Sequence, residues 1–305
     1  MSQGDVHLCF DLGGTKLKGA YVNGRGRILA EATGSVRQDE GFKGLIELFR
    51  EVHSSLPQQK FGKVAVASAG PLHPQKGILL DPTNFFTGNE SWGVLPIVKS
   101  LNKVFKKKVI LENDAAAAAL GEKWRGGHGK SAHNLLAMTL GTGVGIGVVA
   151  NGQLVRAGRG LHPEASHIPI NSENKGLPCG CGANGCIEAY LAGTHFSKRL
   201  GELSGHEAVR LARAGDTKIQ AAFKEYGRHL AQAIRSLCVV FAPEVVVLSG
   251  GFSHAHDLFL DETRAVLPGL MERYRDGIDM LPKLKVSKLQ DDAGILGAAY
   301  IALEQ

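Results

Sequence analysis

Apolar positions along the chain follow two different periods, which predict helices and strands in turn. Apolar residues at helical spacing predict a helix over residues 41–55, and the alanine-rich residues 115–124 predict another. Short apolar runs of the kind that buried strands show occur at residues 63–67 and 108–111. The second half adds helices over 189–203 and 218–241, a strand over 244–248 and a final helix from about residue 291. Strands that alternate with helices predict an α/β fold.

One pattern occurs twice, at an offset of 128 residues. Residues 10–24 and 138–152 align without gaps, and each segment predicts strand, glycine turn, strand, Asn-Gly turn and strand. We therefore expect two similarly built domains, each opening with an antiparallel meander. The predicted organisation is a small N-terminal α/β domain over residues 1–114, on which a C-terminal helix at about 292–305 packs back, and a large α/β domain over 115–291, with a cleft between them.

Composition narrows the class of protein. The 305 residues are 44% hydrophobic and 21% charged, which excludes a largely disordered chain. No run of 18 apolar residues predicts a membrane span, and the first residues lack the pattern of a signal peptide, so we expect a cytoplasmic protein without a membrane partner. The net charge of +6 includes one basic cluster, Lys103 and Lys106 to Lys108, which suits a solvated helix end better than a nucleic-acid surface.

Two glycine turns are candidates for binding phosphate, because backbone N–H groups there can point together at phosphate oxygens. They lie after the first strand and at the matching place in the repeat: Gly13, Gly14, Thr15 and Lys16, then Gly141, Thr142 and Gly143. Asp11 beside a phosphate suits Mg²⁺, which prefers oxygen ligands. Gly250 and Gly251, after an apolar strand, are a weaker candidate for a nucleoside contact. The alternative is that these glycines only close tight turns.

Three of the five cysteines crowd into eight residues, and this is the most specific local signal. Glycines between Cys179, Cys181 and Cys186 let a short loop bring the three sulfurs together. Structural zinc takes four thiolate or imidazole ligands in a tetrahedron. We expect His167 as the fourth ligand, with His162 as the competing choice. The alternative is a glycine loop with reduced cysteines and no metal.

Carboxylates beside these motifs are candidates for substrate chemistry. A metal bound by this loop and His167 would fix Glu164 and Glu188 near each other, as acceptors for adjacent sugar hydroxyls; either glutamate is otherwise an ordinary surface residue. Asp114 lies between a predicted strand and a predicted helix. It is a candidate general base for an attacking hydroxyl, and the structural alternative is that it caps the helix.

Taken together, these segments resemble the ROK family of sugar kinases and repressors, within the broader fold of hexokinase, actin and the heat-shock ATPases. The resemblance covers nearly the whole chain and rests on five segments: residues 11–16, 112–115, 140–143, 164–167 and 179–188. It implies two actin-like (ribonuclease H-like) domains. It also implies an ATP-dependent hexose kinase that phosphorylates the 6-hydroxyl group, with glucose as the first candidate substrate.

The resemblance implies roles for single residues. Asp114 would be the catalytic base, and the two glycine turns would hold the phosphates of ATP with Mg²⁺. The sugar site would be formed by Asn84, Asn113, Asp114, Glu164, His167 and Glu188. Zinc would be bound by His167, Cys179, Cys181 and Cys186. Besides the hexose and ATP we expect a second copy of the chain, in a homodimer, and no nucleic acid.

Two departures from the family pattern leave the sugar open. Ser166 stands where the family usually has glycine, and Pro163 before Glu164 resembles the fructokinases, whereas the cysteine loop resembles glucokinases and N-acetylhexosamine kinases. A fructokinase or mannokinase, or a kinase of N-acetylglucosamine or N-acetylmannosamine, is therefore the alternative.

Two non-enzymatic functions are also considered. A sugar-responsive repressor would carry a DNA-binding helix-turn-helix before the first phosphate turn. Only ten residues precede Asp11, so we expect no such motif here. A sugar-binding protein without catalysis would be favoured if Asp11, Thr15 or Asp114 were missing, and all three are present. We expect an enzyme.

Overall fold

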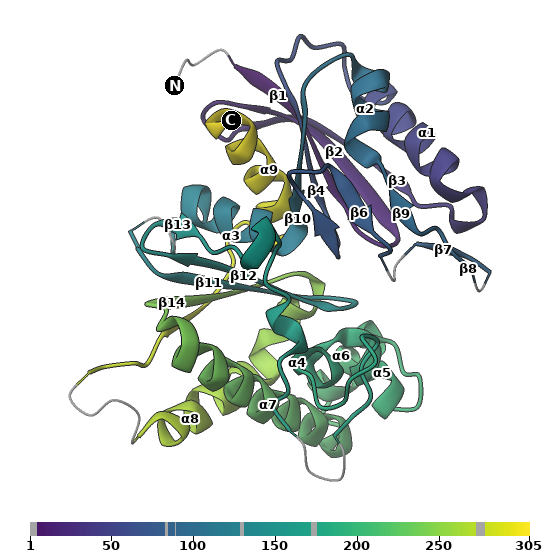
Figure 1. The fold of residues 1–305 in the computed structure, drawn as a ribbon. Helices are drawn as coiled ribbons and strands as arrows, with labels where there is room; N and C mark the ends of the chain where they lie inside the picture. The colour runs from purple at the N-terminus through teal and green to yellow at the C-terminus, as the bar shows by residue number, and fades with distance from the viewer. Residues whose placement is uncertain (1–4, 83–84, 89, 129–130, 172–175, 273–277) are drawn as a thin grey trace. The chain divides into compact units, whose positions relative to one another are not determined.

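The computed structural model describes residues 5–82, 85–88, 90–128, 131–171, 176–272 and 278–305 (Figure 1). The chain divides into two compact units. The first comprises Met1–Lys130, Leu154–Pro163 and Asp292–Gln305, and the second comprises Ser131–Gln153 and Glu164–Asp291. Among the described residues, no helix combines the length and the apolar character needed to cross a lipid bilayer.

The first unit rests on a five-stranded sheet with the strand order β10-β4-β1-β2-β3. Its strands are β1 (Val6–Leu12), β2 (Lys16–Asn23), β3 (Ile28–Ser35), β4 (Val64–Ser68) and β10 (Val109–Asn113). The first three form an antiparallel meander, and β4 and β10 continue the sheet in parallel with β1. Every residue of β4 and β10 is buried, which explains why these strands are short apolar runs rather than alternating ones.

Helices cover both faces of this sheet (Figure 1). Helices α1 (Gly41–Ser54) and α2 (Ile97–Phe105) lie on one face, and α9 (Ala293–Glu304) and α3 (Asp114–Arg125) lie on the other. The smaller elements of this unit are η1 (Gln38–Glu40), β5 (Leu72–His73), β6 (Ile78–Leu80), β7 (Phe86–Thr87), β8 (Glu90–Ser91), β9 (Val94–Leu95) and η2 (Gly158–Gly160).

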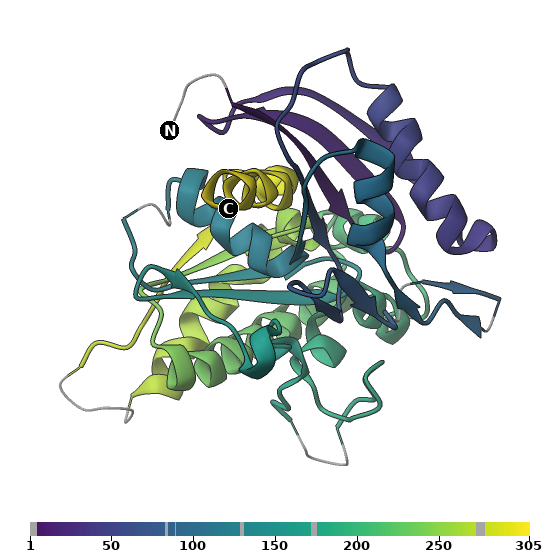
Figure 2. The same ribbon diagram turned by 45° about the horizontal axis from the view of Figure 1, so that its top comes forward.

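The predicted boundary at residue 114 is wrong, because the first unit extends through Lys130 and takes in α3. Helix α3 packs closely along α9, as both views show (Figure 2). Glycines make this approach possible: a Cβ atom on Gly297 would collide with the backbone of Ala117, and one on Gly121 with the backbone of Ala293. Close packing against the C-terminal helix therefore holds α3 in the first unit.

The second unit repeats the topology of the first sheet, with the order β13-β12-β11-β14-β15. Its strands are β11 (Leu135–Leu140), β12 (Val144–Ala150), β13 (Gln153–Leu154), β14 (Val245–Ser249) and β15 (Lys283–Val286). Strands β11 and β12 are antiparallel, whereas β14 and β15 continue in parallel, as β4 and β10 do in the first unit. The repeat in the sequence is therefore a repeat in structure, and the predicted α/β fold is confirmed.

Helices α7 and α8 pack against each other in the second unit. The helices are α4 (Ile187–Leu191), α5 (Gly193–Arg199), α6 (Gly205–Arg213), α7 (Thr217–Phe241) and α8 (Leu260–Met271), with short 3₁₀ turns η3 (Ala165–His167), η5 (Gly251–Leu258) and η6 (Gln290–Asp292) at the ends of loops. Helix α7 matches the prediction over 218–241, but the single helix predicted over 189–203 is wrong. Ala192 has an extended backbone, and the N–H of Gly193 donates to the carbonyl of Gly141, so a new helix begins there.

Candidate functional site

Asn113 and Asp114 lie where β10 ends and α3 begins. The side-chain oxygen of Asn113 accepts a hydrogen bond from the N–H of Ala116 at 3.0 Å, so Asn113 is the N-cap of the helix. Asp114 is the first helical residue, and its Oδ1 accepts from the N–H of Ala115 at 2.8 Å. The capping alternative for Asp114 is therefore wrong. Burial raises the pKa of the Asp114 carboxyl group, although the hydrogen bonds that it accepts act in the opposite direction.

The first glycine turn joins β1 to β2 and is closed by a hydrogen bond from the N–H of Gly13 to the carbonyl of Lys16, at 3.0 Å. Thr15 and Lys16 are exposed beside it. The half-buried Asp11 carboxylate lies at the start of α9, where a Cβ atom on Gly294 would collide with it. A carboxylate is favourable at this place, because the N-terminus of a helix carries partial positive charge.

The second glycine turn joins β11 to β12 and is likewise closed by a hydrogen bond, from the N–H of Gly141 to the carbonyl of Gly143 at 3.0 Å. Local structure explains Gly250, which has a φ of 81° and leaves no room for a Cβ atom against Leu140. It does not explain Gly141 or Gly251, where a Cβ atom would meet no atom of the described residues within 4 Å. These two glycines leave open space beside the backbone of the turn.

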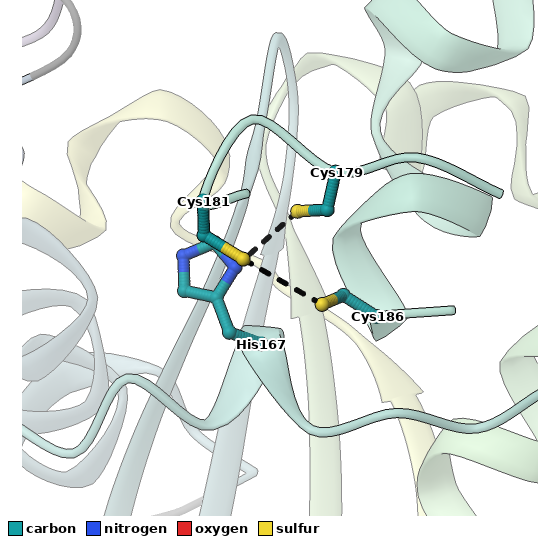
Figure 3. A group of neighbouring side chains, drawn as sticks. All are labelled: His167, Cys179, Cys181 and Cys186. Carbon is teal, nitrogen blue, oxygen red and sulfur yellow. Dashed lines mark hydrogen bonds between the residues drawn. The ribbon is translucent and has the colours of Figure 1, made fainter. Parts of the chain in front are cut away.

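His167, Cys179, Cys181 and Cys186 come together, with their ligand atoms all within 4.8 Å of one another (Figure 3). The Nδ1 atom of His167 lies 3.5 Å from the sulfur of Cys179, and the sulfurs of Cys181 and Cys186 are 3.7 Å apart. The group has the ligand types and the spacing of a metal site. His162, the competing ligand, is not part of it.

The loop that carries the cysteines is shaped by its glycines. Gly182 and Gly185 have φ values of 88° and 79°, and a Cβ atom on Gly185 would collide with the backbone carbonyl of Asn171. The N–H of Cys179 donates to the carbonyl of Ala183 at 2.9 Å, which closes the turn. Burial raises the pKa of the Cys179 thiol to about 12, so a thiolate at this position needs a cation beside it.

Glu188 connects the cysteine group to the second glycine turn. Its Oε2 atom accepts a hydrogen bond from the N–H of Val144 at 3.1 Å, and its Oε1 atom lies 3.8 Å from the sulfur of Cys179. A Cβ atom on Gly143 would lie 2.9 Å from Oε2, so glycine is needed for this approach. The sequence suggested the neighbourhood of Glu188 and the cysteines but not its contact with the turn.

Glu164 and His167 lie on either end of the short turn η3, where the N–H of His167 donates to the carbonyl of Glu164 at 3.1 Å. Ser166, which replaces the glycine usual at this position, is buried between them. Asn84 lies outside the described residues. The structure therefore brings Asn113 and Asp114 together in the first unit, and His167 and Glu188 around the cysteine group in the second.

Two residues that support Glu188 were missed in the sequence. Arg199 donates to the carbonyls of Ala189 at 3.1 Å and Tyr190 at 2.8 Å, and the Tyr226 hydroxyl donates to the carbonyl of Leu191 at 2.9 Å. These three carbonyls end the short helix α4, which carries Glu188 in its first turn. No local pattern marks such contacts, because the donors come from other helices.

Comparison with known proteins identifies the family of this chain. The model of the ROK family matches residues 7–305. The chain belongs to the ROK family. A glucokinase of Thermotoga maritima is 32% identical over 320 residues, which cover 97% of this chain and 96% of that one, and a glucokinase of Halalkalibacterium halodurans is 29% identical over 97% and 94%.

A crystal structure of a ROK family glucokinase from Streptomyces griseus, in complex with glucose and AMPPNP, superposes with a TM-score of 0.81 at 26% identity, covering 98% of this chain and 100% of that one. This likeness and the repeated sheet topology confirm the predicted two-domain, actin-like fold of the ROK family.

Proposed function

We propose that this ROK protein is an ATP-dependent hexose kinase, which transfers the γ-phosphoryl group of ATP to the 6-hydroxyl group of a hexose, with glucose as the first candidate. The observation that carries the proposal is the Asp114 carboxyl group, which stands at the end of a buried parallel strand while its neighbour Asn113 caps the helix. The relatives named as glucokinases support the choice of reaction.

Phosphoryl transfer needs an aligned nucleophile, a base and a clamp for the charge of the phosphate groups. Asp114 accepts the proton of the 6-hydroxyl group while the oxygen of that hydroxyl bonds to the γ-phosphorus of ATP. At the same time the bond from the γ-phosphorus to the bridging oxygen breaks, and ADP leaves with that oxygen. Burial raises the pKa of Asp114, and a base becomes more effective as its pKa approaches the working pH. Asn113, Glu164, His167 and Glu188 are the proposed acceptors and donors for the other sugar hydroxyls.

The two glycine turns are the proposed clamp for ATP. The turns Gly13 to Lys16 and Gly141 to Gly143 would donate to the phosphates from backbone N–H groups other than those of Gly13 and Gly141, which close the turns. Thr15 and Thr142 would add hydroxyl donors, and Gly250 and Gly251 would lie beside the nucleoside. The open space at Gly141 and Gly251 supports this assignment, because no contact with the described part of the chain requires glycine there. Mg²⁺ bound with the nucleotide would neutralise phosphate charge, and Asp11 offers the oxygen ligand that this ion prefers.

Gly141→Ala tests the clamp. The added methyl group meets no atom among the described residues, so the melting temperature should stay that of the wild type. The KM for ATP should rise on the order of tenfold, because the phosphate can no longer approach the backbone. Gly269→Ala, on α8, is the matched control, since its methyl group also meets none of the residues that the structure describes. Steady-state kinetics at saturating hexose give the KM for ATP of each protein. Equal KM values for both variants and the wild type would rule out a contact between Gly141 and the phosphates of ATP.

We also propose that the cysteine group binds one structural zinc ion. A tetrahedron with zinc–ligand distances of about 2.1–2.3 Å has edges of about 3.6–3.8 Å. Two of the six separations, 3.5 Å and 3.7 Å, are close to these edges, and all six are within 4.8 Å, so small side-chain movements would complete the tetrahedron. Three thiolates and an imidazole would close the coordination shell, which is the arrangement of a structural rather than a catalytic ion. Bound there, zinc would hold η3 and the first turn of α4, which carry the proposed sugar ligands.

The preferred hexose is tested by a panel of substrates. We expect kcat/KM for glucose to be highest among glucose, fructose, mannose, N-acetylglucosamine and N-acetylmannosamine at saturating Mg·ATP, because a site that pairs each hydroxyl rejects analogues by large factors. A coupled assay of ADP release gives the values. If glucose falls more than about tenfold below another hexose, that hexose replaces it and the kinase assignment stands. Binding of a hexose without turnover would favour the sugar-responsive regulator instead.

The homodimer and the cytoplasmic location remain predictions.

A further inference from the structure

The carboxylate of Glu112 is the most buried charge beside the proposed base. Its side chain is 3% exposed, and it stands on β10, two residues before Asp114. A buried carboxylate needs partners for both oxygens, because leaving water costs several kcal/mol that only good hydrogen bonds offset. Glu112 plays no part in the reaction proposed above, so its burial at this position calls for a separate explanation.

Arg156 supplies those partners as a bidentate ion pair. Its Nη1 atom donates to Oε1 of Glu112 at 2.7 Å, and its Nη2 atom donates to Oε2. The Arg156 side chain is 33% exposed, so the guanidinium reaches the buried carboxylate from the surface of the first unit. A planar guanidinium matches a carboxylate in this geometry, and a lysine ammonium cannot make both bonds in the same way.

The same carboxylate also holds the backbone of the proposed sugar site. Oε1 of Glu112 accepts a hydrogen bond from the N–H of Asn113 at 2.9 Å. Among the described residues, β10 is the outermost strand of its sheet, so an N–H on its outer side has no described strand beside it to bond. The Glu112 side chain takes the place of that missing strand at Asn113, whose own side chain then caps α3 and sets the start of the helix that bears Asp114.

We propose that Arg156 is a positioning residue for Asn113 and Asp114, acting through Glu112. This inference rests on the proposed function, since it assigns Arg156 a part in that reaction without contact to the substrate. Arg156 belongs to Leu154–Pro163, the segment of the first unit that directly precedes Glu164 and His167 along the chain. The ion pair therefore anchors this segment to the end of β10.

Arg156→Ala tests the proposal. We expect kcat for the best hexose to fall by about 10- to 100-fold per folded molecule, because small misplacements of a catalytic group cost factors of this size. A few millimolar guanidinium chloride should restore much of the loss, since the exposed guanidinium leaves an opening to the solvent. Arg156→Lys should give an intermediate kcat without rescue, and it keeps the test usable if the alanine variant folds poorly.

Arg228→Ala is the matched control. It removes another arginine–carboxylate pair, in which Nε of Arg228 lies 2.8 Å from Oε1 of Glu262, from the helices of the second unit. Its kcat and its response to guanidinium should equal those of the wild type. This comparison separates the loss of the Glu112 pair from the loss of an ion pair in general.

Amide hydrogen exchange gives a readout that does not depend on turnover. Exchange at residues 113–116 should be faster in Arg156→Ala than in the wild type and should slow again with guanidinium. If the wild type phosphorylates no hexose, the proposed function fails, and the exchange data alone decide whether Arg156 holds this segment. A kcat within about twofold of the wild type, a loss that guanidinium does not restore, or unchanged exchange at these amides would overturn the inference.

Discussion

Asp114→Asn is expected to lower kcat for the best hexose by about 10²- to 10⁴-fold, the usual contribution of a general base. The amide keeps the size of the side chain and can still accept the hydrogen bond from Ala115, but it cannot take the proton of the attacking hydroxyl. Hexose affinity, measured by calorimetry, should change little. Because burial raises the pKa of Asp114, the wild-type rate should fall on acidification at a higher pH than for an ordinary aspartate, as the base becomes protonated.

Asp216→Asn is the control for this substitution. Asp216 caps α7 by accepting a hydrogen bond from the N–H of Ile219, and asparagine is an equally good cap, so this variant should keep full activity. If Asp114→Asn retains more than about a third of the wild-type kcat, Asp114 is not the base, and another group accepts the proton of the attacking hydroxyl.

Removal of the metal is expected to have the second largest effect. Protein purified without chelators should contain one zinc ion per chain, and a strong chelator should lower the melting temperature and the hexose kinase activity together, the latter by at least about tenfold. The physical reason is that His167 lies in η3, which directly follows Glu164, and that Cys186 is the N-cap of α4, whose first turn carries Glu188. Metal analysis, calorimetry and the coupled assay follow the three quantities on the same samples.

Cysteine variants show whether the effect belongs to this group. Cys181→Ser should lose zinc, whereas Cys238→Ala should keep it, since Cys238 lies on α7 outside the metal group. Fully active protein that contains no metal would rule out the structural role of zinc.

The fold was predictable from the sequence because the two halves repeat one pattern. The glycine and Asn-Gly turns mark strand ends locally, and the repeat then assigns β1 to β3 and β11 to β13 to equivalent places. The boundary at residue 114 was wrong because α3 is held by α9, whose residues lie far along the chain. Helix α8 was not predicted, and it contains Pro268, which ordinarily interrupts a helix.

The candidate site was predictable where its residues are close in sequence. Cys179, Cys181 and Cys186 lie within one loop, so their convergence with His167 follows from the spacing. Contacts between distant residues left no such pattern. Arg156 and Glu112 are 44 residues apart, and the bond between Glu188 and Val144 spans the same separation. Such pairs depend on how the strands and loops pack, which residue spacing alone does not specify.

The most direct test of the central claim is the identity of the product. Wild-type protein is incubated with Mg·ATP and the hexose of highest kcat/KM, and ³¹P and ¹³C NMR spectra follow the phosphate and carbon 6 of the sugar. We predict stoichiometric formation of ADP and a hexose 6-phosphate by the wild type, and almost none by Asp114→Asn. Phosphate on another hydroxyl group, ATP hydrolysis without a phosphorylated sugar, or equal product from both proteins would contradict the assignment of Asp114 as the base of a hexose 6-kinase.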